Sequence, residues 1–326
     1  MVRTRIILPY FGTFNHYFSL WLDSCGRNSG FDWLIITDAT LECELPSNVT
    51  VIKSSLSEMK KEFQKKLDIP IVLEKPYKLC DYKQFYGYLF SEYLSGYDYW
   101  GYCDCDLIFG DIEAFLPHEV QGQYDKIFRT GHFSLVKNDP AINELFFQYG
   151  TYRISLTSSV IYGYDESITG YHLGFAGELI DSGYRFLDQP EWIADVDYRH
   201  YPFREVSDSK RPCIYSYENG KIYRIDWDGQ NIKRQEKIYV HLQKRKMQVH
   251  IDIDRNRYLI IPNCFHLYDE SLLCDPSFWH CITREDENYF NKQKELRQNR
   301  IRDLKRFLHE PRKLDSILYR IRGHRG

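Results

Sequence analysis

The sequence predicts an α/β fold with a mixed, mostly parallel sheet flanked by helices, followed by antiparallel hairpins and a basic helical tail. Over residues 1–200, short apolar runs alternate with segments of helical periodicity, which is the pattern of βαβ units. Beyond residue 200 the chain alternates apolar and polar residues and contains Asn-Gly and Asp-Gly pairs, which are typical of hairpin turns. The segment 292–326 contains 12 Lys/Arg against 4 Asp/Glu, so the rest of the chain is acidic although the total charge is only −3.

Strands are predicted where short apolar runs end in turn residues, and helices where apolar residues recur every three or four positions. The predicted strands of the first part are 5–12, 31–38, 48–55, the aromatic run that ends at Cys103, and 124–139 with a glycine break. The predicted helices are 15–30, 56–67 capped by Ser55 or Ser57, 78–94, 140–152 opened by Pro140, and 173–188 closed by Gly183. We expect a core over 1–200, a hairpin-rich segment over 201–290 that completes the site, and a tail over 291–326.

The composition indicates a folded protein of the cytoplasm. Hydrophobic residues make up 43% of the chain, which is enough for a large core. The nine cysteines are odd in number and contain no Cys-x-x-Cys pair, so we expect reduced thiols rather than zinc sites or a disulfide framework. The N-terminal apolar run is too short for a secretory signal, and no run of about 18 apolar residues could span a bilayer. We expect no nucleic-acid partner.

The most informative stretch is YWGYCDCDLIFGD (99–111), in which an apolar run ends in Asp104 and Asp106. Asp-x-Asp occurs four times, at 104/106, 195/197, 226/228 and 252/254. The last two pairs lie in polar, hairpin-like surroundings and the pair at 195/197 in a loop-like segment, where water can solvate them. Only the first pair ends a buried strand. Residues i and i+2 of a strand point the same way, so two such carboxylates repel unless a cation lies between them.

Two carboxylates at the carboxyl end of a strand favour a site for a metal and a diphosphate. Mg²⁺ and Mn²⁺ prefer oxygen ligands and complete their shells with phosphate oxygens and water. In open α/β sheets, ligands bind beyond the carboxyl ends of the strands. Pro9, Tyr10, Phe11 and Asp38 also lie at such ends, and the two aromatic rings offer a surface on which a base could stack. The sequence therefore predicts Mn²⁺ or Mg²⁺ and a nucleoside diphosphate at this edge of the sheet.

The block YKLCDYKQFYGYLFSEYLSGYDYWGYCDCDLIFGDI (77–112) resembles the GT-A-fold glycosyltransferases that use nucleotide sugars. It is similar in particular to the clostridial-toxin glucosyltransferases and Golgi α-mannosyltransferases, in which a helix with Lys-Ser-Asp precedes a strand that ends in Asp-x-Asp. With LPYFG, EKPYKLCD and GHFSL, the chain resembles still more an uncharacterised bacterial family found beside capsule and surface-polysaccharide genes. The resemblance covers about residues 5–250 and implies a GT-A (Rossmann-like) fold, a divalent metal and a UDP-sugar donor.

Carried over residue by residue, the resemblance implies that Asp106 binds the metal directly. Asp104 then contacts the donor and completes the metal shell through water, and Asp81 matches the helix aspartate that contacts the donor. Two positions depart from the pattern, because Cys80 stands where the related families have serine and Gln84 where they have arginine. The resemblance therefore does not define how the donor sugar is held.

A late histidine commonly returns to the metal in GT-A enzymes, and His241 in KIYVHLQKRKMQ resembles it; the alternative is a strand histidine beside a solvated basic turn. Lysines that follow it would meet the diphosphate and neutralise charge on the leaving group. The further candidates for donor binding each have a plain alternative as a turn, surface or packing residue: Asp38, Lys75, Lys78, His132, Lys244 and Lys246.

The segment YDESITGYHLGFAGELIDSGYRF (164–186) resembles the acceptor loop and following helix of GT-A enzymes. Asp165, Glu166 and Glu178 are candidates for a catalytic base or for contacts with donor and acceptor hydroxyls. An inverting enzyme needs a carboxylate base, whereas a retaining enzyme, as in the resembling families, needs none beyond the leaving phosphate.

The tail predicts an amphipathic helix, because Leu314, Ile317, Leu318 and Ile321 form an apolar stripe between basic residues. Such a helix could lie on the anionic inner face of the cytoplasmic membrane, close to a lipid-linked saccharide acceptor. The alternative is packing against the catalytic domain or a partner.

Three functions remain open from the sequence. The first is a metal-dependent glycosyltransferase of surface-polysaccharide biosynthesis that uses a UDP-sugar and an oligosaccharide or lipid-linked acceptor. The second is a sugar-phosphate nucleotidyltransferase, which needs a glycine-rich phosphate loop that LPYFGTFNHY lacks. The third is a non-catalytic carbohydrate-binding protein that uses the aromatic residues, which make up 16% of the chain.

Overall fold

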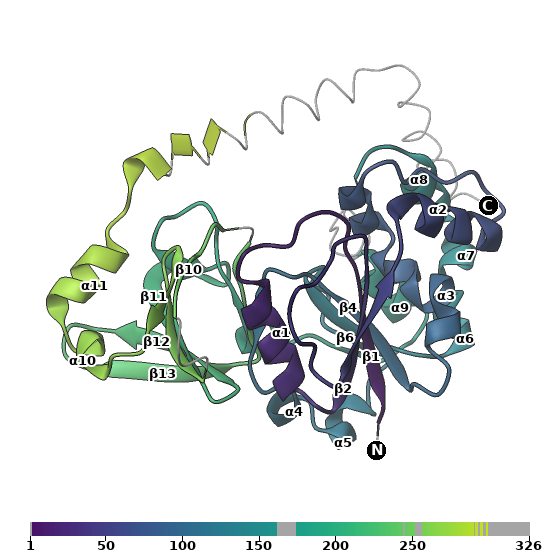
Figure 1. Ribbon diagram of the computed structural model, residues 1–326. Helices are drawn as coiled ribbons and strands as arrows, with labels where there is room; N and C mark the ends of the chain where they lie inside the picture. The colour runs from purple at the N-terminus through teal and green to yellow at the C-terminus, as the bar shows by residue number, and fades with distance from the viewer. Residues whose placement is uncertain are drawn as a thin grey trace.

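Three sheets form the framework of the protein in the computed structural model, which describes residues 2–161, 174–243, 245–251, 256–289, 291, 292, 294, 295 and 298. The main sheet has seven strands in the order β3-β2-β1-β4-β7-β6-β8 (Figure 1). These strands are β1 (Thr4–Pro9), β2 (Phe31–Thr37), β3 (Val49–Lys53), β4 (Tyr99–Cys103), β6 (Lys126–Ile127), β7 (Phe133–Lys137) and β8 (Phe186–Leu187). The first four run parallel, and β7 is antiparallel to its neighbours β4 and β6. The sheet is therefore mixed and mostly parallel, as predicted.

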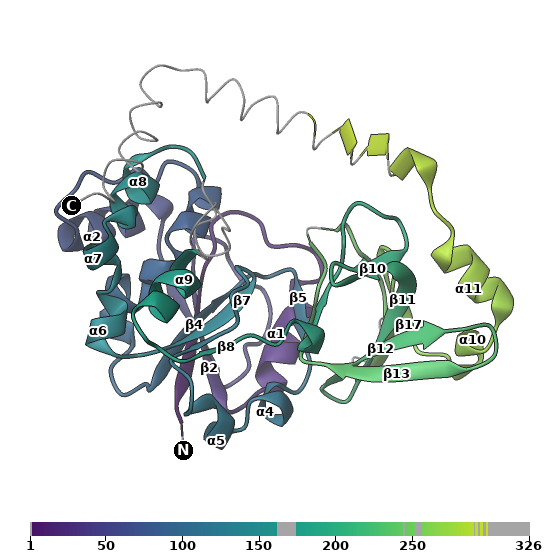
Figure 2. The ribbon, with the colours of Figure 1, turned by 180° about the vertical axis from the view of Figure 1, so that it is seen from behind.

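Helices cover both faces of the main sheet (Figures 1 and 2). One face packs against α1 (Phe18–Arg27), α4 (Ile112–Phe115) and α5 (His118–Gln121). The other packs against α2 (Leu56–Lys66), α3 (Tyr86–Leu89), α6 (Pro140–Asn143), α7 (Phe146–Tyr149), α8 (Thr151–Thr157) and α9 (Gly174–Asp181). Along β1, Ile6 and Leu8 enter one core and Ile7 the other, since successive side chains of a strand point to opposite faces. Burial on both faces explains why these strands appear in the sequence as continuous apolar runs.

A small sheet continues from the main one and carries part of the site. It has the order β5-β14-β9, with β5 (Leu107–Phe109), β14 (Tyr239–His241) and β9 (Ile193–Asp195). β14 runs antiparallel to β5 and parallel to β9. The chain therefore leaves the main sheet at the end of β4 and enters the small sheet at β5, and Asp104-Cys105-Asp106 forms the link.

The third sheet is built from hairpins and lies at the opposite end of the molecule from α2 and α7 (Figures 1 and 2). Its strands are β10 (Phe203–Glu205), β11 (Asp208–Glu218), β12 (Lys221–Trp227), β13 (Ile232–Lys237), β15 (Gln248–His250), β16 (Arg257–Ile261) and β17 (Cys264–Leu267). Its inner face packs against the small sheet and α1, through residues such as Tyr215 and Val240. Its outer face, which includes Ile214 and Ile225, is covered by α10 (Glu270–Leu273) and α11 (Pro276–Thr283).

Most predicted elements are present. Ser55 caps α2 in a capping box with Glu58, and Pro140 opens α6. The Asn-Gly and Asp-Gly pairs connect β11 to β12 and β12 to β13, with Asn219 and Gly220 at φ values of 53° and 90° that a tight hairpin turn requires. All nine cysteines lie among the described residues and are free thiols.

The predicted helix over 78–94 is instead a series of short turns: η1 (Pro76–Asp81), η2 (Lys83–Phe85), α3 and η3 (Ser91–Tyr93). Side chains on every side of this segment are buried, including the polar ones of Lys78 and Gln84. Gly87 also lies so close to Trp100 that an added Cβ would approach the indole nitrogen to 2.4 Å. Tertiary packing therefore overrides the helical preference of the sequence.

Two other predictions are refined. The predicted strand over 124–139 is the antiparallel pair β6 and β7, and the predicted helix over 140–152 is divided into α6 and α7, which ends at Gly150 with a φ of 67°. Among the helices of the described residues, none is both long enough and apolar enough to cross a membrane.

We expect Gly101→Ala to destabilise the protein. An added Cβ at this position of β4 would lie 2.6 Å from the backbone oxygen of Ser134 on β7, where the backbone has no room to move away. Overpacking of this kind costs about 1–3 kcal/mol, measured as the free energy of unfolding in urea. In the control Gly30→Ala, the added carbon meets only the flexible side chain of Glu113 and should have an effect within about 0.5 kcal/mol. Equal stability of the two variants would contradict this packing of β4 on β7.

Candidate functional site

Asp104 and Asp106 lie where the main and small sheets join. The backbone N–H of Asp104 donates to the carbonyl of His132 at 2.9 Å, which ties the link to the start of β7. The carbonyl of Asp106 accepts from the N–H of Leu242, just after β14, also at 2.9 Å. Both carboxylates are therefore fixed at the carboxyl end of β4 by strands from distant parts of the chain.

Two overlapping groups of side chains converge at this link. Ligand atoms of Asp104, Asp106 and His241 all lie within 4.8 Å of one another, as do those of His132, Asp195 and His241. His241 belongs to both groups, because its Nε2 lies 3.6 Å from Asp106 Oδ1 and its Nδ1 lies 2.8 Å from Asp195 Oδ1. We call these five residues the acidic–histidine cluster.

Asp195 belongs to this cluster, although the sequence predicts that it lies in a solvated loop. It is the last residue of β9, and the parallel register of β9 with β14 places it opposite His241. Its Oδ1 also accepts from Gln243 Nε2 at 2.7 Å. Asp197, the other half of this Asp-x-Asp, instead forms an ion pair with Arg199. Nothing in the sequence distinguishes Asp195 from Asp197, because β9 is only three residues long and its partner β14 lies far along the chain.

The imidazoles of the cluster have opposite electrostatic surroundings. His132 stacks on His241 with 4.1 Å between ring centroids, and its Nδ1 forms a hydrogen bond with the Tyr239 hydroxyl at 2.9 Å. Burial and the neighbouring His241 lower the pKa of His132 to about 3. Burial alone would also lower the pKa of His241, but the carboxylates of Asp106 and Asp195 outweigh it and raise that pKa to about 10. His132 is therefore neutral, whereas His241 holds a proton between two carboxylates.

Lys83 is a second residue that the sequence analysis did not identify. Its buried ammonium donates to Asp104 Oδ1 at 2.8 Å and to the carbonyl of Gly131 at 2.6 Å. The short turns over 76–93 direct it to the carboxylate. The helix that the sequence predicts over this segment does not indicate that Lys83 faces Asp104. The sequence offers only the presence of a lysine within the block 77–112.

Lys78 and Asp81 are buried and face each other. Lys78 Nζ donates to Asp81 Oδ2 and to the carbonyls of Ser155 and Val160, each at 2.6 Å. Burial lowers the pKa of Lys78, and the bond to Asp81 opposes that shift. Their charges neutralise each other within the protein.

Tyr10, directly after β1, is an aromatic residue that interacts electrostatically with Cys105 and Asp106. Burial and the Cys105 thiol, with a smaller contribution from Asp106, raise the pKa of Tyr10 to about 12. Its ring stacks on Phe14 with 4.4 Å between centroids, whereas Phe11 is only 6% exposed and packs into the core. Pro9 ends β1 in a buried position. The half-buried Tyr10 is thus the ring that a base could reach.

The remaining candidates do not belong to the cluster. Asp38 follows β2, is exposed, and accepts from the N–H of Gly12 at 2.8 Å, so it fixes the loop after β1. Lys75 and Lys246 are exposed, and Glu178 is buried on α9. Several predictions lie outside the described residues: Lys244, Asp165, Glu166 and the apolar stripe at Leu314, Ile317, Leu318 and Ile321.

The donor set of the cluster fits a divalent cation. Asp104, Asp106 and His241 supply two carboxylates and one imidazole, a mixed oxygen and nitrogen set that suits Mn²⁺ better than Mg²⁺. A metal-ligating imidazole must be neutral, so a cation would replace the proton on His241. Asp195 would then orient the ring through Nδ1, as carboxylates commonly do behind metal-binding histidines.

We expect Asp195→Asn to weaken Mn²⁺ binding by about 10–100-fold, because the neutral amide orients and polarises His241 less well than the carboxylate. Isothermal titration calorimetry with MnCl₂ measures this affinity. The matched control is Asp197→Asn, which alters the other carboxylate of the same Asp-x-Asp and should leave Mn²⁺ affinity unchanged. Equal losses in the two variants would contradict a role for Asp195 in positioning His241.

We expect Lys83→Met to bind Mn²⁺ on the order of tenfold more tightly, because it removes a cation that lies against a carboxylate of the cluster. The loss of a buried hydrogen bond to a charged group should also lower the free energy of unfolding by about 1.5–3 kcal/mol. The control Lys53→Met removes an ammonium that, among the described residues, donates only to the Asp38 carbonyl, and it should not change the affinity for Mn²⁺. Weaker Mn²⁺ binding in Lys83→Met would instead mean that Lys83 holds Asp104 in its ligating position.

Comparison with known proteins gives distant structural neighbours. A galactosyltransferase LgtC in complex with donor and acceptor sugar analogs has a TM-score of 0.33 and 8% sequence identity, over 59% of this chain and 75% of that one. The apo-form glycosyltransferase GlyE of Streptococcus pneumoniae TIGR4 has a TM-score of 0.34 and 12% identity, over 59% of this chain and 46% of that one.

No curated protein matches the sequence significantly. A family profile, in contrast, matches residues 6–269 and so spans the main sheet, the small sheet and the hairpins. The chain therefore belongs to the family described as "Family of unknown function (DUF6625)".

Proposed function

We propose that the protein is a metal-dependent glycosyltransferase. It transfers a sugar from a nucleotide donor, which we expect to be a UDP-sugar, to a saccharide or lipid-linked saccharide acceptor in bacterial surface-polysaccharide biosynthesis. The observation that carries the proposal is the convergence of Asp104, Asp106 and His241 within 4.8 Å at the carboxyl ends of the parallel strands. The resemblance of the block 77–112 to nucleotide-sugar glycosyltransferases supports it.

In this proposal Asp104, Asp106 and His241 hold Mn²⁺ or Mg²⁺. The cation, when bound, supplies positive charge to the diphosphate as the bond between sugar and phosphate breaks. Lys83 lies 2.8 Å from Asp104 and balances part of its negative charge, and Asp195 orients His241. Tyr10 offers its ring to the base of the nucleotide.

Donor binding involves further residues from the ends of the strands and the segment after β14. Lys244 and Lys246 would contact the diphosphate, and Asp38 would contact the nucleoside. Because Lys78 and Asp81 pair with each other, their proposed role is to support the wall of the donor site rather than to add net charge to it. His132, which is neutral and buried, supports His241 by stacking on its ring.

On the acceptor side, Asp165 and Glu166 are the proposed contacts for donor and acceptor hydroxyls, and either carboxylate could serve as a base in an inverting reaction. In a retaining reaction the leaving phosphate takes the proton of the acceptor hydroxyl. We place the reaction in the cytoplasm, at the inner face of the membrane if the basic tail over 292–326 binds anionic lipid.

We expect Asp106→Asn to abolish Mn²⁺-dependent binding of UDP, because it removes a charged ligand from the cluster. Calorimetric titration of UDP in the presence of Mn²⁺ or EDTA measures this. The control Asp228→Asn lies in another Asp-x-Asp, at an exposed turn where asparagine is equally suitable, and should bind UDP as the unaltered protein does. UDP binding that is equally strong in EDTA would refute the proposal, and glycan binding without any nucleotide binding would favour a carbohydrate-binding protein.

The donor can be identified by hydrolysis of a panel of UDP- and GDP-sugars in the presence of Mn²⁺. Release of UDP from one sugar, lost in Asp106→Asn, would define it.

A further inference from the structure

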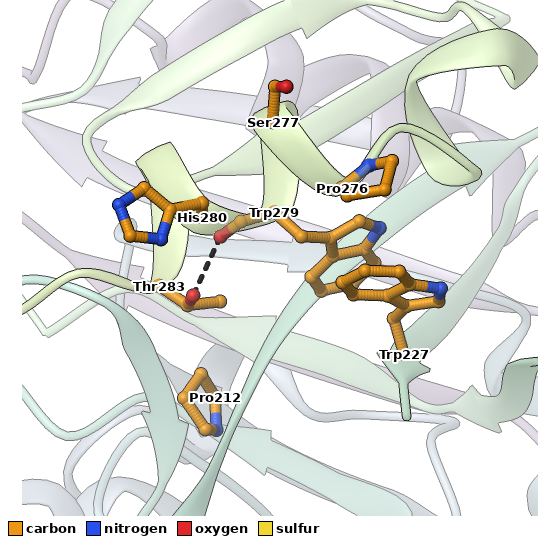
Figure 3. A pocket seen from close by; sticks show the side chains of 7 residues that line it. All are labelled: Pro212, Trp227, Pro276, Ser277, Trp279, His280 and Thr283. Atoms are coloured by element: carbon orange, nitrogen blue, oxygen red, sulfur yellow. Dashed lines mark hydrogen bonds between the residues drawn. The ribbon is translucent and has the colours of Figure 1, made fainter. Parts of the chain in front are cut away.

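A hollow on the outer face of the hairpin sheet lies apart from the acidic–histidine cluster. It is about 660 Å³ in volume and lies between α11 and the strands β11 and β12, from which Pro212 and Trp227 contribute (Figure 3). Pockets that bind small ligands typically measure about 300–1,000 Å³, so the hollow is large enough for one or more sugar rings. The small sheet, whose strands β9 and β14 carry Asp195 and His241, packs on the other face of the hairpin sheet.

A pair of tryptophans forms one wall of the hollow. The rings of Trp227 and Trp279 are stacked, with 5.9 Å between centroids and an interplanar angle of 21° (Figure 3). Trp279 is only 2% exposed, and its Nε1 donates to the carbonyl of Leu273 at 2.9 Å. Trp227 is half-buried and rests on this anchored ring. The result is a rigid aromatic surface, which suits the apolar C–H face of a pyranose ring.

Polar groups line the hollow beside the tryptophans. Ser277, His280 and Thr283 are three residues apart on α11 and therefore follow one another along the helix. The Thr283 hydroxyl donates to the carbonyl of Trp279 at 2.6 Å, so its oxygen remains an acceptor for a ligand hydroxyl. A few polar groups next to an aromatic surface can fix the orientation of a saccharide by its hydroxyl groups.

The charge of the hollow defines the class of ligand. Within the described part of the chain, no Lys, Arg, Asp or Glu lines it. A nucleoside diphosphate or an acidic glycan would find no cation there, whereas a neutral saccharide needs none. The alternative of a proline-rich peptide is less favourable, because proline has no N–H donor and would leave the polar groups of α11 with fewer hydrogen bonds than a saccharide would.

We infer that this hollow is a second saccharide-binding site, which holds a neutral segment of the acceptor glycan away from the bond-forming end. The inference rests on the proposed function, since it assumes a saccharide acceptor. A glycan that is held in the hollow keeps its acceptor end close to the acidic–histidine cluster. This raises the effective concentration of the acceptor end there, even where each contact is weak.

Calorimetric titration of the full chain with cellohexaose, maltohexaose, mannohexaose and chitohexaose tests the inference. At least one of these neutral hexasaccharides should bind, and Trp227→Ala should weaken that binding about tenfold or more. Because Trp227 also packs on Trp279, a second variant, His280→Glu, introduces a charge at an exposed position without altering the core. It should weaken the same hexasaccharide similarly.

Mn²⁺-dependent UDP binding, measured in the same samples, separates this inference from the proposed function. Both variants should bind UDP as the unaltered protein does. The inference is overturned if no hexasaccharide binds at millimolar concentration, if both variants bind it normally, or if decaproline binds the hollow and the hexasaccharides do not. If the protein binds a hexasaccharide but never binds UDP, the hollow does not serve to hold an acceptor glycan, and the proposed function is refuted as well.

Discussion

The gathering of three carboxylates around one imidazole is the constraint on which the site depends. Asp104 and Asp106 have ligand atoms within 4.8 Å of each other, and Asp195 lies against the other ring nitrogen of His241. Like charges gathered in this way repel unless cations lie among them. The protein supplies two cations of its own, the ammonium of Lys83 against Asp104 and the protonated ring of His241 between the other two. In the proposed function a divalent ion would replace the proton of His241, with Asp104, Asp106 and His241 as its ligands.

Two sheets are needed to build this arrangement. The main sheet brings Asp104 and Asp106 to the end of β4, but the groups that face them arrive on β9 and β14, which belong to the small sheet. Arg245 holds the chain just beyond β14, since its buried guanidinium donates to the carbonyls of Tyr201 and Asp197. The hairpin sheet also supports the site, because β13 and β15, the strands that precede and follow β14 along the chain, both belong to it.

The sequence was most informative where local patterns decide structure, and least where distant pairing does. Continuous apolar runs identified the buried strands, and Asn219-Gly220 identified a hairpin because few other residue pairs adopt those backbone angles. His241 was found by resemblance, but Asp195 was not, since its role depends on a parallel pairing of two three-residue strands. Lys83 was missed because tertiary contacts convert an expected helix into short turns.

The hairpin sheet can serve two sites because its strands present alternate residues to opposite faces. On β11, Tyr215 faces the small sheet and the cluster beyond it, whereas Ile214 faces the helices that form the hollow. No described residue that lines the hollow belongs to the acidic–histidine cluster, so a change in one leaves the ligands of the other in place. The hairpin sheet lies between the two sites, because one of its faces packs on the small sheet and the other on α11. A ligand that spans both sites must therefore be chain-like and long enough to pass around this sheet, since the gain in effective concentration is greatest when the length of the connection matches the span.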